Sequence, residues 1–167
     1  MNSNGSWLRR VDETGVPLLL ARIILAATFL YMGSMKVGEP FEFLKGIRQY
    51  QMLPETPAIY LNATAIVLPW LEIIAGVALL IGLRFRGAAA AIALMLLVFT
   101  PAILIRGLHI LSEKGGSFFE VVFDCGCGTG PVTIWTKLLG NVGLFILAML
   151  ALVSRSRKLC LSTWLAR

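Results

Sequence analysis

Four separate stretches of this chain are long and apolar enough to cross a lipid bilayer, and they constrain its fold more than any other feature. They cover residues 16–36, 59–82, 87–105 and 132–153. A membrane-spanning helix needs about 20 mostly apolar residues, and in lipid its backbone groups must be satisfied within the segment. The sequence therefore predicts an all-α integral membrane four-helix bundle, formed as one domain over residues 1–167.

The composition supports lipid as the solvent of this chain. Hydrophobic residues make up 57% of it and charged residues only 14%, where a soluble domain carries about 25% charged residues. The net charge of +6 does not indicate nucleic-acid binding, because the cations flank apolar segments instead of forming a basic stripe with interleaved aromatic residues. Arg22 inside the long first segment favours a retained span over a cleaved signal peptide.

The distribution of charge predicts the orientation. Most cations fall beside the two termini and in the turn 82–87, namely Arg9, Arg10, Arg84, Arg86, Arg155, Arg157, Lys158 and Arg167. Each of the two longer loops on the other side carries as many acidic as basic residues, when Lys36 and Lys137 at the adjoining ends of the spans are counted with them. By the positive-inside rule both termini are then cytoplasmic. We expect a multi-pass protein of the bacterial cytoplasmic membrane, with its longer loops on the periplasmic side.

Two outer loops follow from this topology. In residues 39–57, Pro40 and the apolar spacing after it predict a short helix on the outer membrane surface, or a loop packed on the bundle. The second loop, residues 106–131, is longer than most loops of compact domains. Its segment 117–123 predicts a short strand or an interfacial segment.

Arg22 and Glu72 are charges inside predicted spans, where they are costly and tend to face a partner. If the inner ends of the first and second spans lie at the same depth, Arg22 is about 9 Å and Glu72 about 15 Å from that depth, at 1.5 Å per residue. The gap of about 6 Å predicts an Arg22–Glu72 ion pair. Such a pair either fixes helix register alone or forms a polar site for a quinone head group or a proton.

Three further cations, Lys36, Arg106 and Lys137, fall at the outer ends of predicted spans. They either extend their charged ends to the membrane interface or surround one outer opening. His109, the one histidine of the chain, belongs to the same region.

Cys125, Gly126 and Cys127 lie in the second outer loop, where disulfides persist, whereas Cys160 is predicted to be cytoplasmic. A disulfide across one intervening residue closes a small, strained ring, and strained disulfides tend to be oxidising and labile. Nearby cations and the N-terminus of the fourth helix, with Thr129 as a candidate cap, would favour thiolates. Thiol–disulfide exchange, metal binding and a structural role all remain open, although the spacing matches no standard zinc site.

Several short motifs resemble the DoxX and MauE group of small four-helix membrane proteins. They are Arg22 followed by "YMGSMK", "MLP" at 52–54, "PWLEIIAGVALLIGL" at 69–83 and "DCGCGTG" at 124–130. The last is similar to the Cys-Gly-Cys-Phe-Gly motif of the MauE-like branch, with Gly128 in place of phenylalanine. The resemblance implies a redox-associated membrane protein, since MauE-like members are linked to maturation of a periplasmic methylamine dehydrogenase. The candidate residues that it carries over are Arg22, Lys36, Glu72, Cys125 and Cys127.

Two functions are therefore expected. In the first, Cys125 and Cys127 exchange electrons with an extracytoplasmic thiol protein, and a membrane quinone near Arg22 and Glu72, or near Lys36 and Arg106, accepts them. In the second, the chain is a non-catalytic accessory or assembly subunit of a larger respiratory or photosynthetic membrane complex. Small residues, among them Gly76, Gly140 and Gly143, would then permit close helix contacts within the bundle or with that complex.

Overall fold

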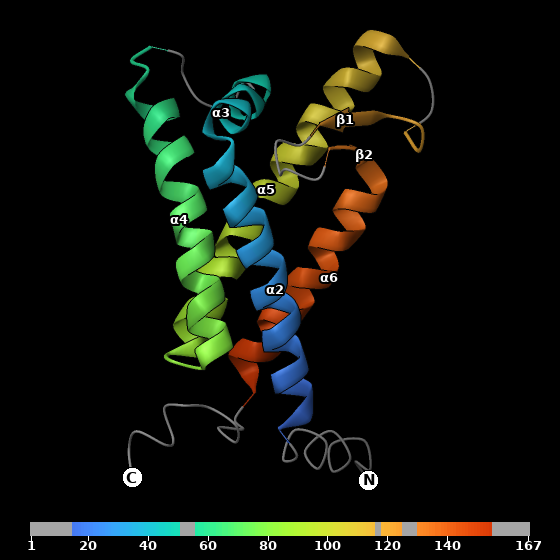
Figure 1. Cartoon of the computed structure of the whole chain (residues 1–167). Coiled ribbons are helices and arrows are strands. Elements are labelled where there is room, and N and C mark those ends of the chain that lie inside the picture. The colour runs from blue at the N-terminus through green and yellow to red at the C-terminus, as the bar shows by residue number, and fades with distance from the viewer. Residues whose placement is uncertain (1–14, 51–55, 116–117, 125–129, 155–167) are drawn as a thin grey trace, which may run out of the picture.

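The chain folds into a bundle of long helices, shown in Figure 1. The computed structural model describes residues 15–50, 56–115, 118–124 and 130–154. Within them, four helices are long and apolar enough to cross a membrane: α2 (Val16–Gly38), α4 (Ile59–Ile81), α5 (Phe85–Lys114) and α6 (Ile134–Val153). The predicted all-α membrane bundle is thereby confirmed.

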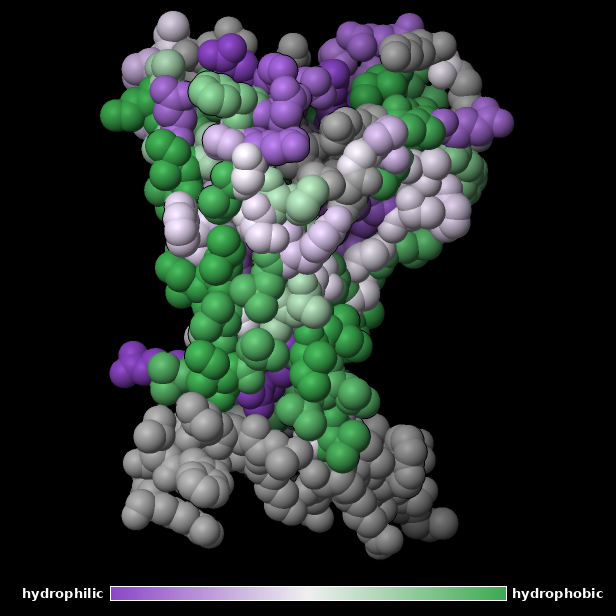
Figure 2. Space-filling view, in the orientation of Figure 1, coloured by the Kyte–Doolittle hydropathy of each residue, from purple (hydrophilic) through white to green (hydrophobic). Residues whose placement is uncertain are grey.

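The surface of the bundle fits a lipid environment. Each of the four long helices exposes large apolar side chains. Figure 2 shows hydrophobic residues along the middle and lower flanks of the viewed face, and hydrophilic residues gathered at the end that carries α3 and the tip of α5. An apolar belt of this kind is what lipid tails require.

Close packing of α2 against α4 forms one half of the bundle. A Cβ at Gly33 would lie 2.8 Å from Ile73 Cγ1 and 3.0 Å from the Pro69 carbonyl oxygen, and a Cβ at Gly76 would lie 2.8 Å from Leu30 Cγ. Glycine on both helices therefore lets the two backbones approach, as expected for Gly76. By contrast, nothing lies within 4 Å of a Cβ built at Gly140 or Gly143, so these two glycines make no close contact within the described bundle.

Arg22 caps the C-terminal end of α4. Its Nε donates to the Leu79 carbonyl oxygen at 2.8 Å and its Nη2 to that of Leu80 at 3.3 Å. These are carbonyls of the last helical turn, which lack helical partners of their own. Gly82 follows with φ 77°, and a Cβ there would lie 2.4 Å from Arg22 Nη2. Glycine is thus required both by the backbone and by the guanidinium.

The predicted turn at 82–87 is confirmed between α4 and α5. Helix α4 ends at Ile81 and α5 begins at Phe85. Arg86 Nη2 donates to the Ser154 carbonyl oxygen at 3.0 Å, which ties this turn to the end of α6. The described chain therefore enters at α2 and leaves at α6 on the side of the bundle that holds this turn (Figure 1).

The first outer loop contains the predicted helix. Helix α3 (Pro40–Gln49) has Pro40 in its first turn, buries Phe43 and leaves Phe41 exposed. It contacts α4 and α2, so the segment is helical, as the first alternative predicts, and packs on the bundle, as the second predicts.

The second outer loop is shorter than predicted. Helix α5 continues through Arg106, Gly107 and His109 to Lys114 and ends before Gly115, where φ is 66°. Strands β1 (Val122–Asp124) and β2 (Pro131–Thr133) then form an antiparallel hairpin. Of the segment 117–123, for which a short strand was one alternative, only residues 122 and 123 lie in β1, and the fourth helix begins at Ile134 instead of residue 132.

Candidate functional site

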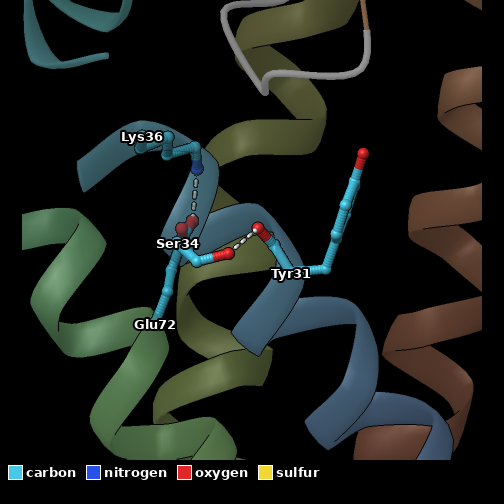
Figure 3. A network of polar contacts seen from close by, with 4 residues as sticks. All are labelled: Tyr31, Ser34, Lys36 and Glu72. Carbon is cyan, nitrogen blue, oxygen red and sulfur yellow. Dashed lines mark hydrogen bonds and ion pairs between the residues drawn. The ribbon is translucent and has the colours of Figure 1, made fainter. Parts of the chain in front are cut away.

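A buried ion pair joins α2 to α4. Lys36 Nζ lies 2.5 Å from Glu72 Oε1, and the exposed fractions of the two side chains are 4% and 2%. Figure 3 shows the two side chains pointing toward each other, beside the turn in which the Ser34 hydroxyl donates to the Tyr31 carbonyl oxygen. The predicted Arg22–Glu72 pair is therefore wrong: Glu72 pairs with Lys36, and Arg22 caps α4.

Glu72 pairs with Lys36 instead of Arg22 because α2 and α4 are shifted relative to each other along their axes. Arg22 lies beside Gly82, just past the end of α4, so the first six residues of α2 extend about 9 Å beyond α4 at 1.5 Å per residue. This shift separates the backbones of Arg22 and Glu72 by about 15 Å in depth and brings Lys36 within about 6 Å of the level of Glu72. Side chains also lean toward the N-terminus of their own helix. Because α2 and α4 are antiparallel, the Lys36 side chain leans toward the end of the bundle with the turn 82–87, and the Glu72 side chain leans toward the end with α3. The two side chains therefore converge.

Aromatic rings surround the ammonium of Lys36. Its Nζ lies 4.9 Å from the ring centroid of Phe43 in α3 and 5.5 Å from that of Phe99 in α5. A desolvated ammonium over an aromatic face gains about 2 kcal/mol or more. Lys36 is thus held inside the bundle by three other helices, and the prediction that it extends to the membrane interface is wrong.

Next to this pair lies a pocket of about 50 Å³. Its lining comes from five helices and comprises Phe29, Met32, Lys36, Phe43, Tyr50, Glu72, Leu96, Phe99, Ile103, Lys137, Asn141 and Leu144. The polar groups in this lining are few, and the rest is apolar or aromatic. Mostly apolar walls with a small number of placed polar groups are typical of small-molecule sites.

The pocket contains an unsatisfied acceptor. Glu72 Oε2 is buried and has no hydrogen-bond partner among the residues that the structure describes. Lys137 and Asn141 line the same pocket from α6, one turn apart. The amide of Asn141 donates from Nδ2 to Thr100 Oγ1 at 3.3 Å. A buried carboxylate oxygen, an ammonium and an amide thus face one small space.

Sequence reasoning placed Lys137 at the outer rim and did not identify Asn141 or Tyr50. The i, i+4 spacing of Lys137 and Asn141 puts them on one face of α6, a signal that could have identified both. Arg106 is half-buried in α5 and does not line the pocket. His109 lies on the outer part of α5, where its Nδ1 is 3.4 Å from Glu113 Oε1 and both side chains are exposed.

Cys125, Cys127 and Thr129 lie outside the described residues, but the strands on either side are placed. The register pairs Asp124 with Pro131, so the segment with both cysteines connects two paired strands, which lie toward the end of the bundle that carries α3 (Figure 1). Strand β2 leads directly into α6, and Lys137 follows Ile134 by about 4.5 Å, three residues at 1.5 Å each. The hairpin and the pocket are therefore about one helical turn apart along α6.

Two comparisons with known proteins identify relatives of this chain. A family model described as methylamine utilisation protein MauE matches residues 14–154. A curated methylamine utilization protein MauE from Paracoccus denitrificans is 30% identical over 131 residues, which is 77% of this chain and 64% of that protein. The alignment thus spans less than two thirds of the relative. No solved structure matches the chain significantly.

Proposed function

The chain belongs to the MauE family, and on this premise we propose that it performs thiol–disulfide exchange on the outer face of a bacterial cytoplasmic membrane. The exchange would serve methylamine utilisation, for which the family model and the Paracoccus relative are named. The observation that carries the proposal is the hairpin, whose Asp124–Pro131 register brackets Cys125 and Cys127 at the outer end of the bundle. The excess of cations beside the termini and in the turn 82–87 supports an orientation with this end outside the cytoplasm.

The chemistry oxidises a partner protein. A thiolate of the partner attacks a Cys125–Cys127 disulfide, a mixed disulfide forms, and a second partner thiol resolves it. The partner leaves with a new disulfide, and Cys125 and Cys127 remain as two thiols. A membrane quinone then accepts their two electrons and two protons, which restores the disulfide and gives the quinol. The quinone is the co-reactant that this cycle requires.

A second function is favoured by α6. It is the least buried of the four spans, because only 17% of the residues in its apolar 18-residue segment are buried. Gly140 and Gly143 are exposed on it and leave room for a close neighbour. Small residues on a lipid-exposed face permit helix association. In this alternative the chain is a non-catalytic assembly subunit, and a helix of a membrane redox complex packs on α6.

Thiol trapping in intact cells separates the two functions. A membrane-impermeant maleimide is applied with and without prior reduction, and Cys160→Ser serves as the matched control, since Cys160 is predicted to be cytoplasmic. Exchange predicts that Cys125 and Cys127 are labelled only after reduction and that Cys125→Ser or Cys127→Ser abolishes methylamine-dependent growth. Permanently free thiols, or full growth of both variants, would reject exchange in favour of the assembly function.

A further inference from the structure

We propose that the pocket next to the Lys36–Glu72 ion pair binds the head group of a membrane quinone. Glu72 would accept from the ring hydroxyl of the quinol form, and Lys137 and Asn141 would donate to a ring oxygen. The inference rests on the proposed function in one respect, namely that a quinone reoxidises the thiols. The binding site consists of the pocket residues alone and does not include the cysteines.

The unsatisfied oxygen of Glu72 indicates a ligand that donates. Buried polar atoms in native proteins are nearly always hydrogen-bonded, because an unpaired one carries its full desolvation cost. Lys36 satisfies Oε1, while Oε2 has no partner among the described residues. A hydroxyl group in the pocket next to this oxygen would satisfy it. A ligand with acceptor groups only would leave it unsatisfied.

The other polar groups of the pocket indicate that the ligand also accepts. Lys36 and Glu72 neutralise each other, so the ammonium of Lys137 gives the lining a formal charge of +1. An ammonium has three donor hydrogens and no acceptor, and the amide of Asn141 can also donate. A carbonyl oxygen, or an oxygen that becomes anionic during reduction, is the complement of these donors. Because Glu72 is on α4 and Lys137 on α6, the two oxygens of the ligand would point to different helices.

Size and shape restrict the rest of the ligand. A single water needs roughly 10–15 Å³ of such a cavity, and a cavity of about 150 Å³ binds benzene, so the pocket of about 50 Å³ admits a small ring only when its lining side chains move, and it excludes a nucleotide. Phe29, Phe43, Tyr50 and Phe99 supply aromatic walls. A flat ring with an oxygen at each of two edges fits this lining. Among lipid-soluble molecules, quinones have this structure, and their apolar tail can remain in the bilayer.

The test is a binding measurement on the full chain in lipid nanodiscs. A short-chain ubiquinone, in its quinone and quinol forms, is titrated and followed by isothermal calorimetry, with the Cys125→Ser/Cys127→Ser variant tested alongside. We expect saturable binding by both proteins. Lys137→Met should raise the Kd of the quinone at least about tenfold, the effect of one hydrogen bond to a charged group. Lys45→Met is the matched control, because Lys45 is an exposed lysine of α3 and its loss should leave the Kd unchanged.

A second variant separates a ligand contact from a loss of folding. Glu72→Gln should weaken binding of the quinol by more than that of the quinone, because only the quinol donates a hydroxyl to Oε2. A merely structural effect would weaken both forms equally and would overturn the role of Glu72. Absence of saturable binding by the folded wild type, or equal binding by Lys137→Met, would overturn the site. Quinone binding without thiol cycling would instead reject the proposed function and keep the site.

Discussion

Removal of Lys36 alone should destabilise the bundle strongly, whereas removal of the whole ion pair should not. At 2.5 Å and an effective dielectric constant near 20, the attraction between Lys36 and Glu72 is about 7 kcal/mol. Desolvation of each buried ion costs several kcal/mol, so the pair contributes little net stability. Lys36→Met removes the attraction and leaves the Glu72 carboxylate buried among apolar groups. We expect a loss of about 3–5 kcal/mol in the free energy of unfolding.

The double variant Lys36→Met/Glu72→Leu should recover most of this loss, because no buried charge remains. The free energy of unfolding would be measured by titrating lipid–detergent micelles with dodecyl sulfate and following far-ultraviolet circular dichroism. The matched control is Lys45→Met, since Lys45 and Glu42 are also 2.5 Å apart but their side chains are 66% and 63% exposed. An exposed pair contributes about 0–1 kcal/mol. The reasoning is refuted if Lys36→Met costs no more than Lys45→Met, or if the double variant is less stable than the single one.

Three further predictions concern other parts of the molecule. Gly33→Ala should cost about 1–3 kcal/mol by overpacking, because its Cβ would meet the Pro69 carbonyl oxygen at 3.0 Å; Gly140→Ala, which meets nothing within 4 Å, should be neutral in the same unfolding assay. Arg22→Met should cost about 1–3 kcal/mol, because carbonyls at the end of α4 lose their donor in a buried site; amide hydrogen exchange should rise in the last turn of α4, and unchanged exchange there would contradict the cap. In the assembly alternative, Gly143→Leu should block co-purification of a partner by filling the exposed face of α6; under the exchange function, growth and thiol oxidation should be insensitive to it.

The spans and the inner turn could be predicted from the sequence because hydropathy and length determine which segments enter lipid. Helix α3 was also predictable, since Pro40 and its apolar spacing are local signals. The partner of Glu72 was predicted wrongly because the relative height of two helices is set by contacts such as Gly33 against Pro69, which a single sequence does not reveal. The lean of side chains toward their own N-terminus would have favoured Lys36 over Arg22.

The pocket was only partly predictable. Lys36 and Glu72 are identifiable from the sequence as charges near or within apolar spans, whereas Asn141 is an uncharged residue in an apolar helix and carries no such signal. The sequence predicts Lys137 at the outer rim because it lies near the start of the fourth span. Its place in the pocket depends on which residues of the other helices gather around the start of α6, which the sequence of α6 alone does not reveal.

The most direct test of the account is the redox state of Cys125 and Cys127 in isolated membranes whose quinone pool is held oxidised or reduced. Alkylation under each condition, followed by mass spectrometry, gives the fraction of the two residues in a disulfide. The account predicts a disulfide with an oxidised pool and, after exposure to a reduced thiol protein, accumulation of dithiol only when the pool is held reduced. A redox state of these cysteines that does not depend on the quinone pool would contradict it.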